Sequence, residues 1–335
     1  MREKNARRWF LEVSRVVMTL DLLLIVLSLW SCSRQVDSIT IGNPAFESGA
    51  LIYIAQDQHF FIGNGLKVAI KDYDSGLAAV NGLLKNEVDM AGAAEFAMVD
   101  KAFRKERLRV IGILDRFQFV YLVGRKDRGI GTPSDLKGKK IGVPRQTIAE
   151  FYLGRFLNLH GMNLPDVARV DVRPSRAVAA IADGNIDAIV YYEPYAHAVK
   201  ERLGSNGISW PAQSSQPTSG IVVCRENWIA RHGKRVSNFL RALVQSEEYA
   251  IHHPAEARAI VQKKLHHDDA YMAAIWPEHQ FSLSLDQSLI LAMEDEARWM
   301  IKNNLTNEKQ VPDFVNYIYV DGLKAVKPEA VNIIR

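Results

Sequence analysis

From residue 38 onward, short apolar runs alternate along the chain with longer segments in which apolar residues recur at helical spacing. The short runs have the length of buried strands. The expected strands of this first stretch are 38–42, 66–70, 88–92, 108–114 and 117–124, and the expected helices are 49–58, 76–85 and a segment from about residue 95. This strand–helix–strand rhythm predicts an α/β fold with a mainly parallel sheet covered by helices.

The same rhythm begins again after a polar stretch, 126–133, that contains glycine and proline and has the composition of a linker. The second series has expected strands at 140–143, 168–172 and 186–192 and expected helices at 148–160 and 176–183. Another loose stretch, 204–219, precedes a strand at 221–224, and residues 235–304 are expected to be almost entirely helical.

Two such series separated by loose stretches predict two lobes joined by two chain crossings. Lobe I is expected to combine residues 38–125 with 220–335, and lobe II to comprise 126–219. Each lobe would be a mainly parallel sheet flanked by helices, and the carboxyl-terminal region of lobe I would be helical.

The amino terminus, residues 1–31, has the pattern of an export signal. The basic start MREKNARR is followed by a 15-residue apolar stretch, 16–30, which is shorter than the ~20 residues that a spanning helix needs. Leu29-Trp30-Ser31-Cys32 resembles the lipobox of bacterial lipoproteins, which predicts cleavage before Cys32, lipidation of Cys32 and an extracytoplasmic protein anchored to a membrane. Trp30 and Asp21 depart from the usual pattern, so plain secretion and an uncleaved anchor remain alternatives, as do the inner and the outer membrane.

Composition and charge restrict the kinds of molecule that the protein is expected to bind. The chain of 335 residues is 48% hydrophobic and 24% charged, which is ordinary for a globular protein. Its formal net charge is +4, and without the first 31 residues 37 basic and 35 acidic side chains remain, a net charge of +2. A nearly neutral domain argues against a nucleic-acid partner.

Several expected helices start directly after polar residues that can cap them. Ser48 and Ser75 precede two helices of lobe I, and Thr147, two residues after Arg145, precedes one of lobe II with capping-box spacing to Glu150. A cap is usually structural, but a crevice surrounded by helix amino termini also suits an anion.

At these residues the sequence resembles the substrate-binding proteins of ABC importers that serve nitrate, sulfonate, taurine and thiamine pyrimidine precursors. The resemblance covers residues 38–261 and rests on a combination of stretches: Asp74-Ser75-Gly76, 82–89 (GLLKNEVD), 135–143 (DLKGKKIGV), 145–161, and 183–188 (DGNIDA) through Glu193-Pro194. It implies the two-lobed type II periplasmic-binding fold with a small ligand at the lobe interface. It also implies a monomer without a cofactor that passes its ligand to a permease and ATPase complex.

Loops that follow successive strands meet around one crevice in such folds. We therefore expect the ligand-binding residues to be Asn43, Phe46, Ser48, Ser75, Gly76, Ala94, Glu95, Arg145, Thr147, Ile148, Tyr191 and Glu193. Side chains alternate along a strand, so Tyr191 and Glu193 should share one face and Tyr192 the other. In the alternative interpretation, the tyrosines belong to the core and Glu193 forms an ion pair.

The identity of the ligand stays open from the sequence. A buried Glu193 would accept hydrogen bonds from an amino group or a pyrimidine N–H. Nitrate or a simple sulfonate would instead require Arg145, Thr147 and Ser75 as donors.

Two other function classes remain as alternatives. Thiamine-pyrimidine synthases and some menaquinone-pathway enzymes resemble this fold, but the cysteine cluster of the synthases has no counterpart here, and we expect no enzymatic activity. The pairs His252-His253 and His266-His267 do not predict a metal site, because adjacent residues on a helix point in different directions. A tethered interaction protein that uses its helical carboxyl-terminal region is the third class.

Overall fold

The structure, a computed structural model, describes residues 36–213 and 216–334, and the described residues from Ser38 onward form one compact unit. The expected signal segment and Cys32 lie outside the described residues. Within the described part of the chain, no helix has the length and apolar character needed to cross a membrane.

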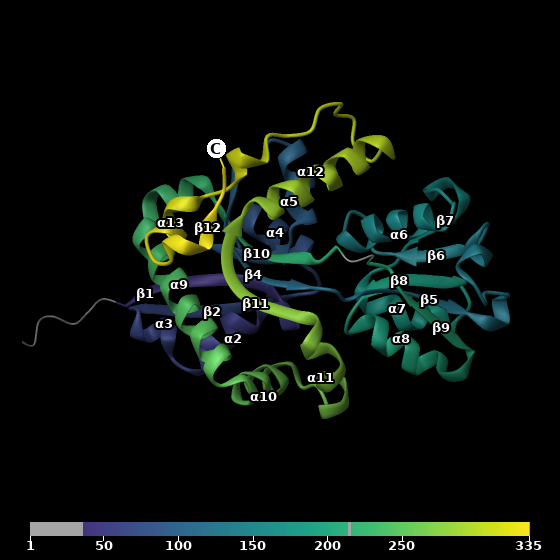
Figure 1. Cartoon of the computed structure of the whole chain (residues 1–335), viewed down its shortest axis with the longest axis horizontal. Helices are drawn as coiled ribbons and strands as arrows, with labels where there is room; N and C mark the ends of the chain where they lie inside the picture. Colours follow the sequence, from purple (N-terminus) through teal and green to yellow (C-terminus); the bar gives the residue numbers. More distant parts are fainter. Residues whose placement is uncertain (1–35, 214–215, 335) are drawn as a thin grey trace, which may run out of the picture. The chain divides into compact units, whose positions relative to one another are not determined.

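The strands form two sheets (Figure 1). The seven-stranded sheet has the order β12-β11-β4-β10-β3-β1-β2 and the five-stranded sheet the order β7-β6-β8-β5-β9. The strands of the larger sheet are β1 (Asp37–Pro44), β2 (Leu66–Tyr73), β3 (Met90–Ala94), β4 (Leu108–Phe117), β10 (Thr218–Arg225), β11 (His279–Asp286) and β12 (Val331–Asn332). Those of the smaller sheet are β5 (Val120–Arg125), β6 (Lys140–Val143), β7 (Ala168–Asp171), β8 (Ala188–Tyr192) and β9 (Gly207–Pro211).

Helices lie on both sides of each sheet (Figure 1). The longer ones are α2 (Ala50–Asp57), α4 (Gly76–Leu84), α5 (Phe96–Phe103), α6 (Ile148–Leu159), α8 (Tyr195–Leu203), α9 (Glu226–His252), α10 (Pro254–Leu265) and α12 (Gln287–Lys302). The shorter ones are α3 (Phe60–Gly63), α7 (Ala177–Ala182), α11 (Asp269–Ile275) and α13 (Val320–Lys324). Most of the expected helices are present within a few residues of their expected bounds.

Both sheets are mixed rather than mainly parallel. In the larger sheet, β10 runs antiparallel to β3 and β4, and in the smaller one β5 runs antiparallel to β8 and β9. β5 and β10 are the strands by which the chain enters one sheet directly from the other. No helical crossover precedes them, so the geometry that makes strand–helix–strand units parallel does not apply.

The chain passes from the larger sheet to the smaller one and back again, and these two passages divide it into one half for each sheet. The second passage lies between β9 and β10, inside the expected stretch 204–219. The first lies between β4 and β5, so residues 120–125 belong to the smaller sheet and not to lobe I as expected. The polar stretch 126–133 is a loop inside the second half, since a polar connection between two strands has the same composition as a linker.

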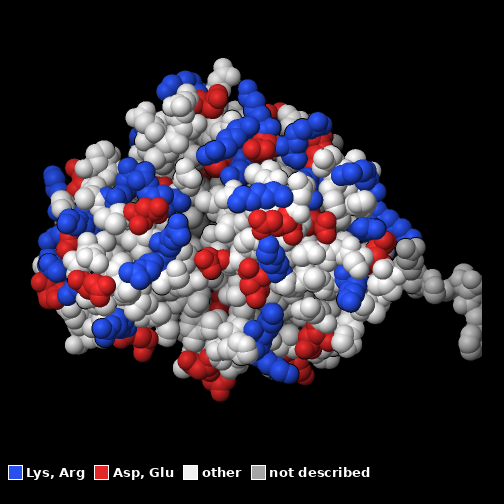
Figure 2. Space-filling model, turned by 180° about the vertical axis from the view of Figure 1, so that it is seen from behind, with Lys and Arg blue, Asp and Glu red and all other residues white. Residues whose placement is uncertain are grey.

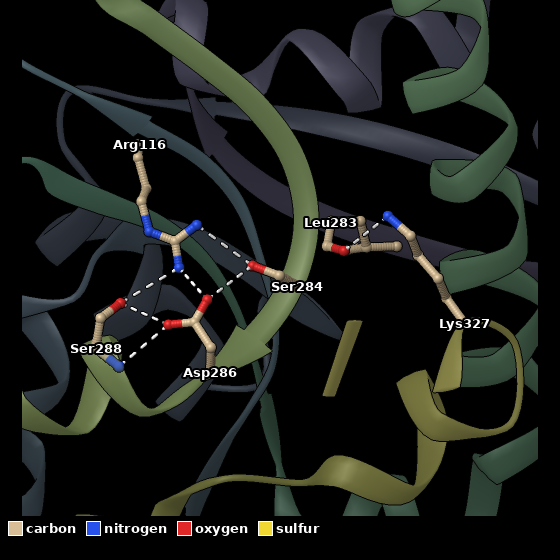
Figure 3. Close-up of polar contacts among 6 residues, drawn as sticks. All are labelled: Arg116, Leu283, Ser284, Asp286, Ser288 and Lys327. Atoms are coloured by element: carbon tan, nitrogen blue, oxygen red, sulfur yellow. Dashed lines mark hydrogen bonds and ion pairs between the residues drawn. The ribbon is translucent and has the colours of Figure 1, made fainter. Parts of the chain in front are cut away.

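Residues 235–304 are mostly helical as expected, but β11 interrupts the helices and pairs antiparallel with β4. Polar contacts hold the carboxyl-terminal half of this strand (Figure 3). Arg116 of β4 forms an ion pair with Asp286, and Asp286 accepts a hydrogen bond from the backbone N–H of Ser288 and so caps α12. Lys327 donates to the carbonyl oxygen of Leu283 at 3.2 Å.

Candidate functional site

One pocket is lined by residues of both sheets and has an empty volume of about 640 Å³, including the part that is open to solvent. Its walls come from the ends of β1, β3, β4, β8 and β10 and from the starts of α4 and α6. The strand ends and helix starts of two sheets therefore meet around one cavity.

Most of the residues that the sequence predicted for the site line this pocket. They are Asn43, Phe46, Ser48, Ser75, Gly76, Ala94, Thr147 and Ile148. Those from the first three loops come from the larger sheet, and Thr147 and Ile148 face them from the α6 side. The rule that loops after successive strands converge accounts for this part of the prediction.

The start of α4 packs closely against the end of β3 at the pocket wall. Ser75 Oγ accepts a hydrogen bond from the Ala78 N–H at 3.2 Å and caps the helix. A Cβ added at Gly76 would lie 2.7 Å from Cα of Ala93, so only glycine lets the helix start rest on the end of β3. The free N–H groups of the first turn of α4 are thereby brought to the pocket wall.

The start of α6 differs from its prediction. Thr147 lines the pocket but does not cap the helix, because its hydroxyl donates to the carbonyl oxygen of Pro144 at 2.7 Å. Glu150 accepts from the Gln146 N–H at 2.8 Å, so the predicted capping box does not form. The first N–H groups of α6 therefore have no side-chain cap from Thr147, which favours a negatively charged group nearby.

Three predicted residues lie outside the pocket walls because their polar atoms are bound elsewhere. Arg145 forms an ion pair with Glu150 at 3.1 Å. Tyr191 is fully buried, and its hydroxyl donates to the carbonyl oxygen of Val172. Glu193 accepts from the His197 N–H at 2.6 Å and from Lys200 Nζ at 2.8 Å. For Tyr191 and Glu193 the structure has the alternative arrangement, a core tyrosine and an ion pair.

Glu95 is the fourth predicted residue outside the walls. It is fully buried, and its carboxyl oxygens both accept from the Ser219 N–H at 3.0 Å. Burial raises the pKa of Glu95 to about 8, against the opposing effects of that hydrogen bond and of the positive charge of Arg116. Glu95 is therefore largely protonated at neutral pH and supplies little negative charge next to the pocket.

Sequence reasoning missed the aromatic part of the walls. Phe117, Phe119 and Tyr192 line the pocket, and the Tyr192 ring packs 5.4 Å from Phe46 and 5.5 Å from Phe119 between centroids. Alternation along the strand had already separated Tyr192 from Tyr191. The sequence did not tell which face of β8 meets the pocket, since that depends on the antiparallel partner β5.

Tyr192 also places a buried hydroxyl group at the site. It is buried, and among the described residues its hydroxyl has no hydrogen-bond partner. Burial, followed by the neighbouring Tyr195 and Asp74, raises the pKa of Tyr192, so the phenol stays a neutral donor. A buried hydroxyl without a partner is costly, which points to a partner that is supplied from the pocket.

Charged groups are missing from the walls. Within residues 36–213 and 216–334, none of the residues that line the pocket is Lys, Arg, Asp, Glu or His. The described residues also bring no three His, Cys, Asp or Glu side chains together in a way that could hold a metal ion. On the face shown in Figure 2, basic and acidic side chains are intermixed. The site can therefore offer apolar contacts and neutral hydrogen-bond donors.

The sequence is similar to those of several known proteins. The sequence model of the family described as "NMT1/THI5 like" matches residues 48–257. The taurine-binding periplasmic protein of Escherichia coli is 24% identical over 234 residues, which cover 69% of this chain and 72% of the relative. The 4-amino-5-hydroxymethyl-2-methylpyrimidine phosphate synthase of Aspergillus parasiticus is 25% identical over 229 residues, 62% of this chain and 64% of the relative.

Solved structures share the fold. The alkanesulfonate-binding protein SsuA from Xanthomonas axonopodis pv. citri, bound to MOPS, superimposes with a TM-score of 0.74 at 17% identity. The match covers 84% of this chain and 98% of SsuA. The expected periplasmic-binding fold, with helices flanking two sheets, is confirmed by this likeness.

Proposed function

Because the chain belongs to the NMT1/THI5-like family, we propose that it is an extracytoplasmic solute-binding protein that delivers a small ligand to the permease and ATPase of an ABC importer. The observation that carries this proposal is the pocket lined from both sheets. A ligand held there would contact both halves of the chain and favour the arrangement in which they are closed.

The two lobes follow sheet membership in this proposal. Lobe I combines residues 38–117 with 218–334, and lobe II comprises 120–211. The passages at 118–119 and at 212–213 with 216–217 would serve as the hinge. This division keeps the topology expected from the sequence and moves its first boundary back to the end of β4.

The ligand is proposed to be a small organic anion of the sulfonate type. Support comes from the starts of α4 and α6, which both meet the pocket and carry partial positive charge. Ser48, Ser75, Gly76, Thr147 and Ile148 would surround the head of such a ligand. The names of the relatives that bind taurine and alkanesulfonates agree with this ligand class.

Binding without catalysis is the better-supported role, although the family also contains enzymes. General acid–base chemistry needs a titratable group within reach of the substrate. Among the described residues, Tyr192 is the one titratable side chain in the pocket walls, and its raised pKa makes it a poor base. The walls are therefore suited to holding a molecule and not to transforming it.

Attachment to a membrane through a lipid on Cys32 is part of the proposal. Support comes from the residues before Cys32, which resemble a lipobox. Metabolic labelling with a fatty acid should mark the wild-type protein and leave Cys32→Ala unmarked. Equal labelling of both proteins would exclude the lipid anchor and leave the binding function untouched.

A thermal-shift screen tests the binding function. The panel contains methanesulfonate, benzenesulfonate, taurine, nitrate and 4-amino-5-hydroxymethyl-2-methylpyrimidine. A ligand present at about 100 times its Kd should raise the free energy of unfolding by about 2.7 kcal/mol and raise Tm accordingly. If no member of the panel changes Tm, and calorimetry also detects no binding, the proposed function is wrong.

A further inference from the structure

We infer that Tyr192 selects the ligand: its hydroxyl donates to an oxygen of a singly charged head, and the aromatic walls hold an apolar, preferably aromatic, body. This inference rests on the proposed function and specifies the ligand class of the same pocket. Zwitterions that carry an ammonium group and small inorganic anions are excluded by the same walls.

The Tyr192 hydroxyl is the first observation. The side chain is 3% exposed and lines the pocket, and its hydroxyl has no partner in the part of the chain that the structure describes. Contacts with Phe46 and Phe119 fix the orientation of the ring. A fixed donor that is buried and unpaired is preorganised for an acceptor on the ligand.

The apolar walls are the second observation. Phe46, Phe117, Phe119, Leu114 and Ile148 line the same cavity. Phe117 and Phe119 pack edge to face with centroids 4.4 Å apart. An inorganic anion such as nitrate would leave this surface without a partner, whereas an aromatic or alkyl body would cover it.

The distribution of charge is the third observation. Glu95, next to Ala94 in the wall, is bound through both oxygens to the Ser219 N–H, and the nearby Glu193 is paired with Lys200. Asp74 is exposed and is not among the residues that line the pocket. An ammonium group would therefore lose its hydration in the pocket without pairing with a carboxylate of the walls, since Asp74 acts on Tyr192 only through its charge from outside them.

The lack of basic side chains in the described pocket walls limits the negative charge that a ligand can carry there. Among the described residues, no Lys or Arg lines the pocket, so a dianion would meet only neutral donors. The helix starts of α4 and α6 together suit about one negative charge. A monoanionic aryl sulfonate combines the head and the body that these walls can accept.

Calorimetry with benzenesulfonate, taurine and sulfate on the wild-type protein and on Tyr192→Phe tests the inference. Wild type should bind benzenesulfonate at least tenfold more tightly than taurine or sulfate. Tyr192→Phe keeps the ring contacts and should weaken benzenesulfonate about tenfold, the loss typical of one hydrogen bond to a charged group. It should not lower Tm of the ligand-free protein, because it removes an unpaired hydroxyl.

Tyr195→Phe is the matched control. Tyr195 packs against Tyr192 but does not line the pocket, so its variant should bind benzenesulfonate like wild type. Taurine binding as tightly as benzenesulfonate, or unchanged affinity in Tyr192→Phe, would overturn the inference while leaving the proposed function standing. Failure of every ligand in the wider screen would overturn both.

Discussion

At the scale of single residues, two buried carboxyl groups, Glu95 and Glu296, interact with each other. Glu95 and Glu296 are both fully buried, and neither oxygen of Glu296 has a hydrogen-bond partner among the described residues. Burial raises the pKa of Glu95 to about 8, and burial together with the proximity of Glu95 raises the pKa of Glu296 well above its usual value. Burial thus favours the neutral form of both carboxyl groups.

A raised carboxyl pKa makes stability depend on pH. Between an unfolded-state pKa of about 4.3 and the folded-state value of about 8, the folded protein binds more protons than the unfolded one. The free energy of unfolding should therefore fall as pH rises from about 5 to 8. Glu95→Gln removes one of the two groups, so chemical denaturation across this range should show a shallower fall than in wild type.

His279 also contributes to the pH dependence of stability, but it does so in both wild type and Glu95→Gln. Asp115 raises the pKa of His279 despite its burial, so stability from this pair is also lost as pH rises. The observable is therefore the difference between Glu95→Gln and wild type. Identical pH profiles for the two proteins would contradict a protonated Glu95.

The predicted site residues line the pocket where a loop position decides their place, and they lie outside it where the direction of a side chain decides. Ser75 and Gly76 reach the pocket because they begin a helix at the end of a strand. Tyr192 was missed in favour of Tyr191, although alternation separates the two. The sequence lacks the information on which face of β8 is turned toward the other sheet.

At the scale of elements, α6 from the half with the smaller sheet packs against α12 from the half with the larger sheet. Trp299 of α12 packs against Phe151 of α6 with centroids 5.3 Å apart, and Arg155 forms an ion pair with Asp295 at 3.0 Å. Gly154 leaves the space that the Trp299 ring occupies. This contact joins the half that contains α6 to the half that contains α12.

Gly154→Ala is expected to disturb this contact. The added Cβ would lie 2.6 Å from Cζ2 and Nε1 of Trp299, so the ring or the helix must shift. Overpacking of this kind costs about 1–3 kcal/mol in the free energy of unfolding, measurable by urea denaturation. The control is Gly63→Ala in α3, where the Cβ would meet nothing within 4 Å and stability should not fall.

A double variant makes the test specific for the ring. Trp299→Phe shortens the side chain and should reduce the penalty of Gly154→Ala, so that the two effects are not additive. If the effects of the two substitutions on stability add, the penalty of Gly154→Ala does not come from its contact with the Trp299 ring.

Most helices with a clear period were predicted, but β11 was not. Residues 279–286 lie inside a region that was expected to be almost entirely helical. Phe281, Leu283 and Leu285 alternate with polar residues, which is the local pattern of a half-buried strand. The place of this strand in the sheet depends on pairing with β4, more than 160 residues earlier in the sequence, which no local pattern specifies.

At the scale of the whole described region, the two passages between the sheets are connected by one buried side chain. Gln213 Oε1 accepts from the backbone N–H groups of Phe119 at 2.6 Å and Val120 at 2.9 Å. Its Nε2 donates to the Phe117 carbonyl oxygen at 3.3 Å and to Thr218 Oγ1 at 3.2 Å. The sequence predicted two crossings, but a passage of only two residues, Gln118-Phe119, has no linker composition that could mark the first.

Gln213→Ala should therefore weaken the junction between the two halves more than an ordinary surface change would. It leaves the N–H groups of Phe119 and Val120 buried without an acceptor, and each such loss costs about 1–3 kcal/mol, so we expect a total of about 2–6 kcal/mol. Urea denaturation gives the free energy of unfolding, with Gln118→Ala, a half-buried change in the same passage, as a near-neutral control. Since the hinge would also lose its fixed geometry, Gln213→Ala should bind benzenesulfonate more weakly at a temperature where it is still folded. A Gln213→Ala protein as stable as the Gln118→Ala control would show that the passages are held together by other contacts.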